Sequence, residues 1–251
     1  ALAGAFCYGE LGAMMPRAGG EYAYLTRTYG KPIGFLSGWI SLIVGFSAPI
    51  AASSMGVGTY LTSAWPALGE LETVTIPLFS PLKLVFSGAS LVALAVIALF
   101  TLIHSLRVVL GDRVQIVLTI LKLAIVLTFV FLGLTAEGAD LSRLAVSSPL
   151  PSGDLAGAMA VSLIFVSFAY SGWNAAAYLG EEIQNPGRNL PRALLLGTAL
   201  VVFLYLLLNV TFLAAGPLSN ISGVVDVGHK VASSLFGQGV TQLLSGAIAL
   251  A

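Results

Sequence analysis

Apolar runs of about twenty residues recur along this chain, and their length is the feature that most restricts its fold. One of them, "VQIVLTILKLAIVLTFVFLGL", covers positions 114–134. A helix needs about 20 mostly apolar residues to cross the hydrocarbon layer of a bilayer. The chain is 57% hydrophobic and only 9% charged, with a mean hydropathy of +0.97, whereas soluble domains carry about 25% charged residues. The sequence therefore predicts an all-α integral membrane protein that is solvated by the lipid bilayer.

Seven apolar segments form one expected transmembrane domain over residues 1–251. The expected spans are about 1–15, 33–62, 84–104, 114–135, 156–182, 192–215 and 239–251. The first and last are apolar up to the ends of the chain, and no charged region precedes the first. This pattern argues against a signal peptide and predicts an internal piece of a longer protein. The single cysteine, Cys7, excludes an internal disulfide.

The basic residues divide unevenly between the two sets of connecting loops. One set holds Arg17, Arg27, Lys31, Arg107, Arg113, Arg188 and Arg192, and the other holds only Lys83, Arg143 and Lys230. Cytoplasmic loops carry the excess of Lys and Arg, so we expect the first set to face the cytoplasm. The net charge of zero predicts no nucleic-acid partner.

The fifth expected span contains Ser171-Gly172 near its midpoint, inside "FAYSGWNAAAYLGEE". Glycine and serine both weaken a helix interior, and an unwound backbone at membrane depth is tolerated only beside protein or a water-filled cavity. Transporters use such broken helices to bind substrates, and the carbonyl end of a half-helix suits an ammonium group. The alternative is that Ser-Gly only allows close helix packing. Trp173-Asn174 favours the break, because a side-chain amide at this depth needs a polar partner.

A charged hairpin, "GEEIQNPGRNLPRALL", follows this span on the expected cytoplasmic side. Pro186-Gly187 predicts the turn, and Glu181 and Glu182 are close enough in sequence to pair with Arg188 and Arg192 across it. Two interpretations remain open: a solvated loop that anchors two helices, or a latch at an inner gate.

Two long stretches resemble a known family. "FAYSGWNAAAYLGEEIQNPGRNLPRALL" is similar to the sixth helix and following loop of amino acid transporters in the amino acid–polyamine–organocation superfamily. "CYGELGAMMPRAGGEYAYLTRTYGKPIGFLSGW" is similar to their second helix, the cytoplasmic connection and the start of the third. The resemblance covers the whole chain as helices two to early eight, without helix one.

The resemblance implies a five-plus-five inverted-repeat transporter fold, present here in part, with a broken helix at mid-membrane. It implies that the backbone carbonyls of Phe168, Ala169 and Ser171 receive the α-amino group of the substrate, beside Gly172. Phe168 would also act as an outer aromatic lid, and Trp173 and Asn174 would border the side-chain pocket. The donors for the α-carboxylate would lie in the absent first helix.

The second expected span would be helix three of this family, which crosses beneath the substrate. Its "VGFSAPI" stretch supplies Gly45 and Ser47 at mid-depth. Small residues there leave room for a substrate or let helices approach closely, and both interpretations remain open.

Lys122 lies deep in the fourth span, nine residues after Arg113, or about 13 Å at the helical rise. An ammonium at that depth is costly and must face other helices. In the family that the chain resembles, a lysine here takes the place where sodium-coupled relatives bind an ion. Since desolvation lowers the pKa of a lysine, we expect sodium-independent transport that is proton-linked or of the exchange type, with Lys122 as the switch. The alternative is a permanently charged pin between helices.

The expected function is a secondary amino acid permease or exchanger that works by alternating access in the plasma membrane, a bacterial inner membrane. The substrate would have a small or apolar neutral side chain, since no acidic pocket residue for a cationic one is visible. We find no catalytic triad, metal cluster or phosphate loop, so the sequence predicts neither an enzyme nor a bound cofactor. The alternatives are a channel or a non-transporting membrane protein of the same fold, and the need for an accessory subunit is left open.

Overall fold

The computed structural model describes residues 1–70, 73–80, 82–106, 108–145, 155–224 and 226–250. Helices make up nearly all of the regular structure in these ranges, so the predicted all-α class is confirmed. Backbone contacts divide the chain into two compact units, Ala1–Pro49 with Ser147–Tyr205 and Ile50–Val146 with Leu206–Ala251. Two positions used above, Arg107 and Ala251, lie outside the described ranges.

Among the described residues, four helical stretches are long and apolar enough to cross a membrane: Lys31–Ala64, Gly88–Leu106, Arg113–Thr135 and Pro186–Ala215. Large apolar side chains remain exposed along them, such as Leu196 at 69% and Phe131 at 67%. Surfaces of this kind suit contact with lipid and not with water. The chain is therefore part of a multi-pass membrane protein.

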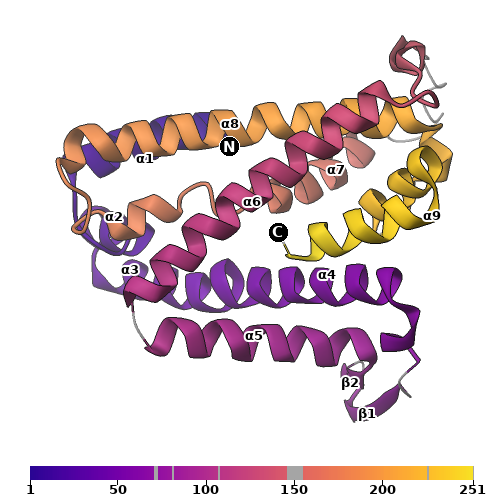
Figure 1. Ribbon diagram of the computed structural model, residues 1–251. Coiled ribbons are helices and arrows are strands. Elements are labelled where there is room, and N and C mark those ends of the chain that lie inside the picture. Colours follow the sequence, from indigo (N-terminus) through magenta and orange to yellow (C-terminus); the bar gives the residue numbers. More distant parts are fainter. Residues whose placement is uncertain (71–72, 81, 107, 146–154, 225, 251) are drawn as a thin grey trace. The chain divides into compact units, whose positions relative to one another are not determined.

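Within the described residues, the α-helices of the first unit (Figure 1) include α1 (Leu2–Met14), α2 (Glu21–Tyr29), α3 (Lys31–Ile40), α7 (Leu155–Ala169) and the first part of α8 (Pro186–Ala215). α1 lies against the beginning of α8 at two glycines. A Cβ atom on Gly12 would lie 2.5 Å from Leu190 Cδ2, and one on Gly9 would lie 3.4 Å from Pro191 Cα. Ala5, Leu190 and Leu194 form the buried core of this unit. The glycines therefore allow the close approach of the two helices.

A π-helical segment, Ser41–Ser47, continues α3 and leads into α4 (Ala48–Ala64). Pro49 lies two residues after this segment, and a proline removes the hydrogen bond to the carbonyl four residues earlier and clashes with it. That carbonyl belongs to Gly45. A widened helical turn before the proline relieves this clash, which explains why the π-helical turns lie just before Pro49.

The second unit contains the remainder of α4 and of α8, together with three further helices: α5 (Gly88–Leu106), α6 (Val108–Thr135) and α9 (Val227–Leu250). α4 and α5 lie side by side (Figure 1), and a Cβ atom on Gly58 would lie 2.3 Å from the carbonyl oxygen of Ala89. The core of the unit consists of Phe129, Ala215, Val231 and Ala232.

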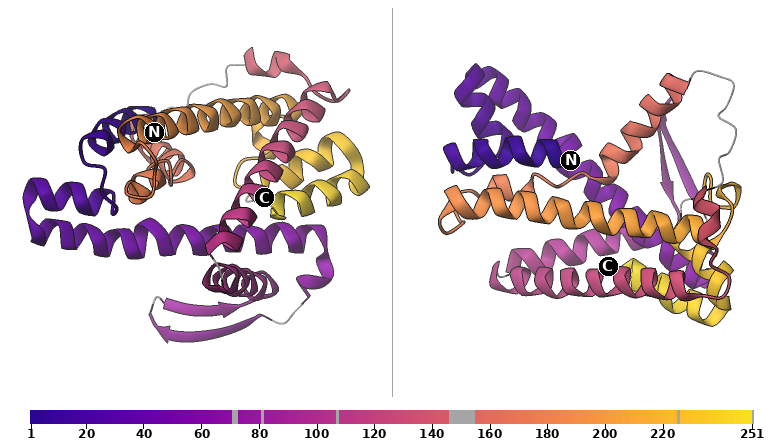
Figure 2. Two further views of the ribbon diagram at one scale, coloured as in Figure 1. Left: turned by 60° about the vertical axis from the view of Figure 1, so that its left-hand side comes forward. Right: turned by 90° about the horizontal axis from the view of Figure 1, so that it is seen from above.

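The connection between α4 and α5 differs from the helix-only expectation. It forms an antiparallel hairpin of β1 (Val74–Phe79) and β2 (Leu82–Phe86), whose strands lie side by side in Figure 2. Thr75, Ile76 and Val85 are β-branched, and such residues favour strands. The expected third span, about 84–104, began inside β2, because the apolar residues 84–86 precede the apolar run of α5 closely; the helix itself begins at Gly88.

Candidate functional site

The fifth expected span is interrupted where the sequence predicted a break. α7 ends at Ala169, residues 170–174 form turns, and a 3₁₀ segment, Ala175–Leu179, follows. The turn closes with a 3.0 Å hydrogen bond from Ser171 N–H to the Phe168 carbonyl. Gly172 has a φ of +91°, a conformation that side chains rarely tolerate. The broken helix is therefore confirmed, and its geometry depends on a glycine.

Two of the three carbonyls expected to receive an α-amino group already accept one hydrogen bond each. The Phe168 carbonyl accepts from Ser171 N–H, and the Ala169 carbonyl accepts from the hydroxyl of Tyr205 on α8, at 3.1 Å. A carbonyl oxygen has two lone pairs, so each keeps one acceptor position. The Phe168 side chain, expected to act as a lid, is 53% exposed.

Trp173 is held against α1. Its ring meets Tyr8 edge to face, with centroids 4.9 Å apart. A Cβ atom on Gly4 would lie 2.7 Å from the Trp173 ring, so no larger residue fits there without displacing the indole. Trp173 also packs on the core of Ala5, Leu190 and Leu194.

Asn174 contacts a residue that no sequence motif indicated. Its amide nitrogen donates a hydrogen bond to Glu21 Oε1, and the hydroxyl of Tyr178 donates one to Glu21 Oε2. Glu21 is the first residue of α2, where an acidic side chain ordinarily complements the positive end of the helix dipole. That ordinary role is why the sequence pattern did not reveal the contact.

The residues just before Glu21 lie against the 3₁₀ segment. Gly19 N–H donates a 3.2 Å hydrogen bond to the Tyr178 carbonyl. Gly20 has a φ of +50°, and a Cβ atom on it would lie 3.1 Å from the Tyr178 ring. A Cβ atom on Gly180 would lie 3.1 Å from the carbonyl oxygen of Arg17. Gly20 and Gly180 therefore allow this close contact, and Gly19 allows the φ of +112° at the same turn.

Tyrosines surround the Glu21 carboxylate. Tyr24 lies one turn along α2 with its ring buried, and Tyr8 contacts it with ring centroids 5.8 Å apart. Burial, and then the negative charge of Glu21, raise the pKa of Tyr24 above its ordinary value. Tyr24 therefore stays a neutral phenol across the physiological pH range.

The π-helical segment reaches the same region through Phe46. The rings of Phe46 and Tyr178 meet edge to face at 5.1 Å. Of the two small residues expected near the substrate, Ser47 donates a 2.7 Å hydrogen bond to the Leu42 carbonyl, and Gly45 lies on the exposed surface of the segment. The structure thus brings the π-helical segment next to Tyr178, on the same 3₁₀ segment that begins beside Asn174.

The four charged residues of the hairpin, Glu181, Glu182, Arg188 and Arg192, are all exposed. The structure does not bring them into ion pairs, since the ion pair found within the described ranges joins Asp140 and Arg143. The hairpin is shaped instead by Asn185, with a φ of +50°, and by a 2.6 Å hydrogen bond from the Asn189 amide to the Gln184 carbonyl.

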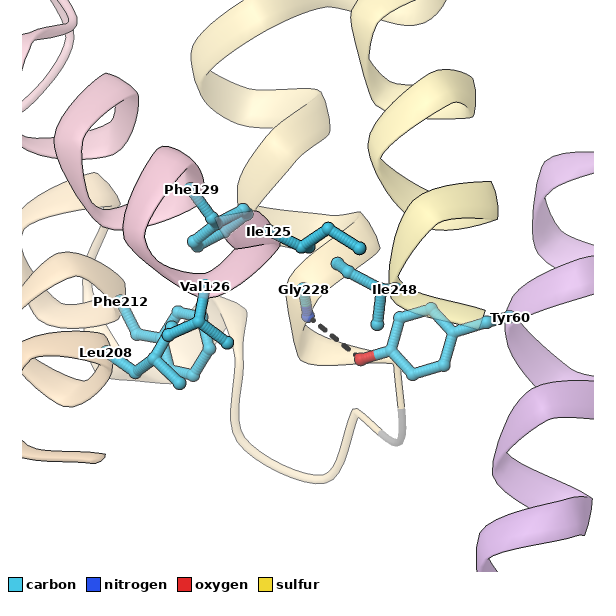
Figure 3. Close-up of a pocket in the computed structure, with 8 residues that line it drawn as sticks. All are labelled: Tyr60, Ile125, Val126, Phe129, Leu208, Phe212, Gly228 and Ile248. Carbon is cyan, nitrogen blue, oxygen red and sulfur yellow. Dashed lines mark hydrogen bonds between the residues drawn. The ribbon is translucent and has the colours of Figure 1, made fainter. Parts of the chain in front are cut away.

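Lys122 belongs to the second unit, where its side chain is exposed on α6. The same unit contains an apolar cavity of about 170 Å³ (Figure 3). Its lining residues are Tyr60, Ile125, Val126, Phe129, Leu208, Phe212, Gly228 and Ile248. Its polar contact is the hydroxyl of Tyr60, which accepts a 3.3 Å hydrogen bond from Gly228 N–H.

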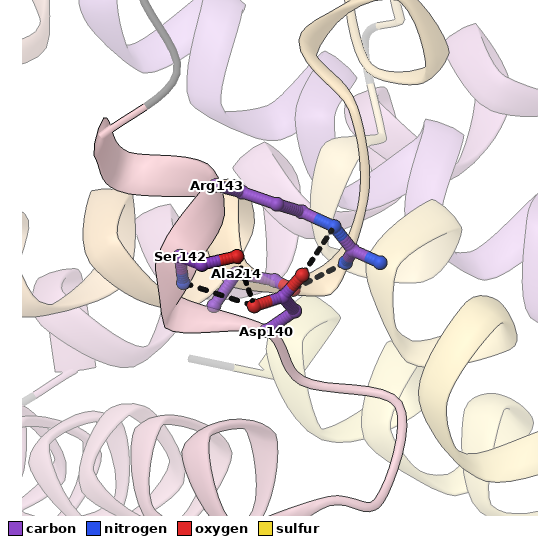
Figure 4. A network of polar contacts seen from close by, with 4 residues as sticks. All are labelled: Asp140, Ser142, Arg143 and Ala214. Atoms are coloured by element: carbon purple, nitrogen blue, oxygen red, sulfur yellow. Dashed lines mark hydrogen bonds and ion pairs between the residues drawn. The ribbon is translucent and has the colours of Figure 1, made fainter.

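A polar network ties the loop after α6 to the end of α8 (Figure 4). Asp140 Oδ1 accepts hydrogen bonds from Ser142 Oγ at 2.6 Å and from Ser142 N–H at 2.9 Å. Arg143 Nη1 donates a 2.6 Å hydrogen bond to the Ala214 carbonyl. The hydrogen bonds from Ser142, and then the charge of Arg143, hold the pKa of Asp140 below its usual value.

Comparison with known proteins identifies the family. The model of the family described as amino acid permease matches residues 1–251. The b(0,+)-type amino acid transporter 1 of Mus musculus is 34% identical over 216 residues, which cover 84% of this chain and 41% of the relative. The Asc-type amino acid transporter 1 of Mus musculus is 29% identical over 235 residues, covering 91% and 42%.

The large neutral amino acids transporter small subunit 2 of Homo sapiens is 30% identical over 218 residues, covering 85% of this chain and 38% of the relative. The chain thus spans about two fifths of the length of these relatives. The family match over residues 1–251, together with the broken helix after Ala169, leads to one conclusion: the chain belongs to the amino acid permease family.

Proposed function

We propose that this chain forms part of a secondary amino acid transporter that works by alternating access. The observation that carries the proposal is the end of α7 at Ala169 within a chain of the amino acid permease family. The carbonyls of a helix C-terminus carry a partial negative charge, and those of Phe168 and Ala169 each keep an acceptor position. The ammonium group of a free amino acid matches both properties.

The proposed substrate is an amino acid with a small or apolar neutral side chain. Trp173 and Phe168 supply apolar surface at the break, and Asn174 supplies one polar group. Proteoliposomes containing the protein should therefore take up labelled neutral amino acids with saturation and with preference for the L-enantiomer. Linear, non-saturating flux would favour a channel, and no flux above empty vesicles would favour a non-transporting membrane protein.

Lys122 is the proposed coupling residue. By the resemblance, its ammonium group would take the place of a bound sodium ion, and its charge would link transport to the proton gradient; in this chain its side chain is exposed on α6. The variant Lys122→Gln should lose uptake driven by a pH gradient and keep binding of the substrate. If proton-driven uptake were unchanged in this variant, Lys122 would not be the coupling residue and its role would be structural.

The proposed location is the plasma membrane, with the connections near Arg17–Lys31 and Arg188–Arg192 on the cytoplasmic side, as the excess of basic residues indicates. Single cysteines placed at positions 27 and 188 in a Cys7→Ser background should react with a membrane-impermeant maleimide only after the cytoplasmic face is opened. If these cysteines reacted in intact cells, the two connections would instead lie on the outer side of the membrane.

A further inference from the structure

We propose that Glu21 is a positioning residue for the substrate site. Its carboxylate fixes the side chain of Asn174 so that the amide nitrogen faces Glu21 and the carbonyl oxygen is kept as an acceptor for the transported amino acid. The inference rests on the proposed function, because Asn174 matters in this way only if an amino acid binds at the break.

The assignment follows from what each group can donate. An ionised carboxylate accepts hydrogen bonds and donates none. Glu21 uses one oxygen for the Asn174 amide and the other for the Tyr178 hydroxyl. Asn174 can therefore meet Glu21 only with its NH₂ group. The opposite orientation of the amide would direct its oxygen at a negatively charged oxygen, which is repulsive.

Glu21 is itself held in place from two sides. The hydrogen bond from Gly19 N–H to the Tyr178 carbonyl fixes the backbone two residues before it. Glu21 also begins α2, whose N-terminal end stabilises a negative charge. Its side chain is half-buried, so the carboxylate is partly shielded from water. A charged acceptor anchored in this way can orient an amide, which a freely moving side chain could not.

The contact also links two parts of the chain that are 153 residues apart. The segment 17–21 lies against the 3₁₀ segment, and Asn174 immediately precedes that segment. A purely mechanical tie would need only Tyr178 and the glycines. The additional bond to Asn174 acts on the one polar side chain that is expected to border the substrate pocket.

Four variants in proteoliposomes test the inference: Glu21→Ala, Glu21→Gln, Asn174→Asp and the double variant Glu21→Gln/Asn174→Asp. The exposed Glu137→Gln, in the loop after α6, makes the same chemical change as Glu21→Gln and is the matched control. Initial rates give KM and Vmax for a neutral and for a cationic amino acid, and thermal unfolding in detergent identifies the folded variants.

Asn174→Asp should lose at least about tenfold in uptake of the neutral amino acid, because two carboxylates then face each other and a charge-assisted hydrogen bond is lost. The double variant should recover at least about tenfold over Asn174→Asp, because the glutamine amide introduced at position 21 can donate to the carboxylate introduced at position 174. Residue 174 then offers the substrate a charged acceptor. The ratio of apparent affinities should shift toward the cationic amino acid by about tenfold.

Glu21→Ala should raise KM for the neutral amino acid by about tenfold with a smaller change in Vmax, since it removes the group that orients Asn174. Glu21→Gln should lie between Glu21→Ala and the parent, because its amide oxygen still accepts from Asn174. Glu137→Gln should transport as the parent does.

Recovery in the double variant without any change of selectivity would overturn the inference and leave Glu21 as a mechanical tie. It would also be overturned if the double variant were no better than Asn174→Asp, or if Asn174→Asp matched the parent. If Glu21→Ala fails to fold, the comparison of the other variants still decides. Failure of the parent protein to transport any amino acid would instead contradict the proposed function.

Discussion

The hydroxyl of Tyr205 donates a 3.1 Å hydrogen bond to the carbonyl oxygen of Ala169, the last residue of α7. The two residues are 36 positions apart, and the rings of Tyr205 and Tyr170 also meet, with centroids 4.9 Å apart. Carbonyls in the last turn of a helix have no backbone N–H donor within that helix. α8 therefore supplies a hydrogen-bond donor for the carbonyl at the end of α7. The end of a broken helix is stabilised by a neighbouring helix and still keeps an acceptor for a ligand.

The variant Tyr205→Phe should destabilise the protein by about 1 kcal/mol, because it removes the hydroxyl and leaves the ring contact intact. Thermal unfolding in detergent micelles measures the change. Tyr29→Phe, at a tyrosine that is 67% exposed at the end of α2, is the matched control and should unfold at the parent temperature. Equal unfolding temperatures for both variants would show that the hydrogen bond adds no net stability.

Gly172→Ala should destabilise the break by about 1–2 kcal/mol, because the φ of +91° is unfavourable for any residue with a Cβ atom. This destabilisation should lower both the Vmax for amino acid uptake and the unfolding temperature of the variant. Gly197→Ala, in the interior of α8, is the control: an added Cβ atom meets open space at both positions, but Gly197 lacks the positive φ. That control should be neutral or slightly stabilising, and equal losses in the two variants would contradict the backbone explanation.

Gly58→Ala should cost about 1–3 kcal/mol of stability by overpacking. Its Cβ atom would lie 2.3 Å from the backbone carbonyl oxygen of Ala89, so α4 and α5 would have to move apart. Gly56→Ala, two residues earlier on α4, meets no atom within 4 Å and should gain about 0.5–1 kcal/mol from the better helix propensity of alanine. Chemical or thermal unfolding measures the stability of each variant relative to the parent, and the two changes should have opposite signs.

The network around Asp140 predicts a dependence of stability on pH. Its pKa is lower in the folded protein than the ordinary value of 3.8. A depressed pKa of this kind stabilises the fold fully above the unfolded-state pKa, and the contribution disappears as the pH falls through the folded-state value. Asp140→Asn should therefore unfold at a lower temperature than the parent at neutral pH, and the two curves should converge below about pH 4.

Ser142→Ala removes the largest cause of the low Asp140 pKa and serves as the companion variant. It should show part of the same loss at neutral pH, again disappearing in acid. A difference between Asp140→Asn and the parent that stays constant from neutral pH down to about pH 3 would assign the effect to packing and not to ionisation.

Features encoded within short stretches could be predicted from the sequence. The break after Ala169 follows from Ser171-Gly172, two adjacent residues that weaken a helix, and the structure confirms it. The hairpin of β1 and β2 was overlooked although Thr75, Ile76 and Val85 favour strands locally. A search for apolar runs has no sensitivity to a connection of that length.

Features that depend on long-range packing could not be predicted in the same way. Glu21 resembles any acidic residue at the start of a helix, and Tyr178 resembles any interfacial aromatic. Their contact exists because Gly20 and Gly180 let two segments that are distant in sequence approach closely. The position of a glycine in the sequence does not indicate which distant segment will pack against it.

The sequence by itself determined the helical membrane class, the family and the position of the broken helix, because span length, scarcity of charge and local helix propensity act over a few turns. Only the tertiary structure decided which groups surround the break: Glu21 on Asn174, Tyr205 on the Ala169 carbonyl, and Phe46 on Tyr178. Those contacts join residues far apart along the chain, and they arise from the packing of helices whose facing surfaces no local pattern specifies.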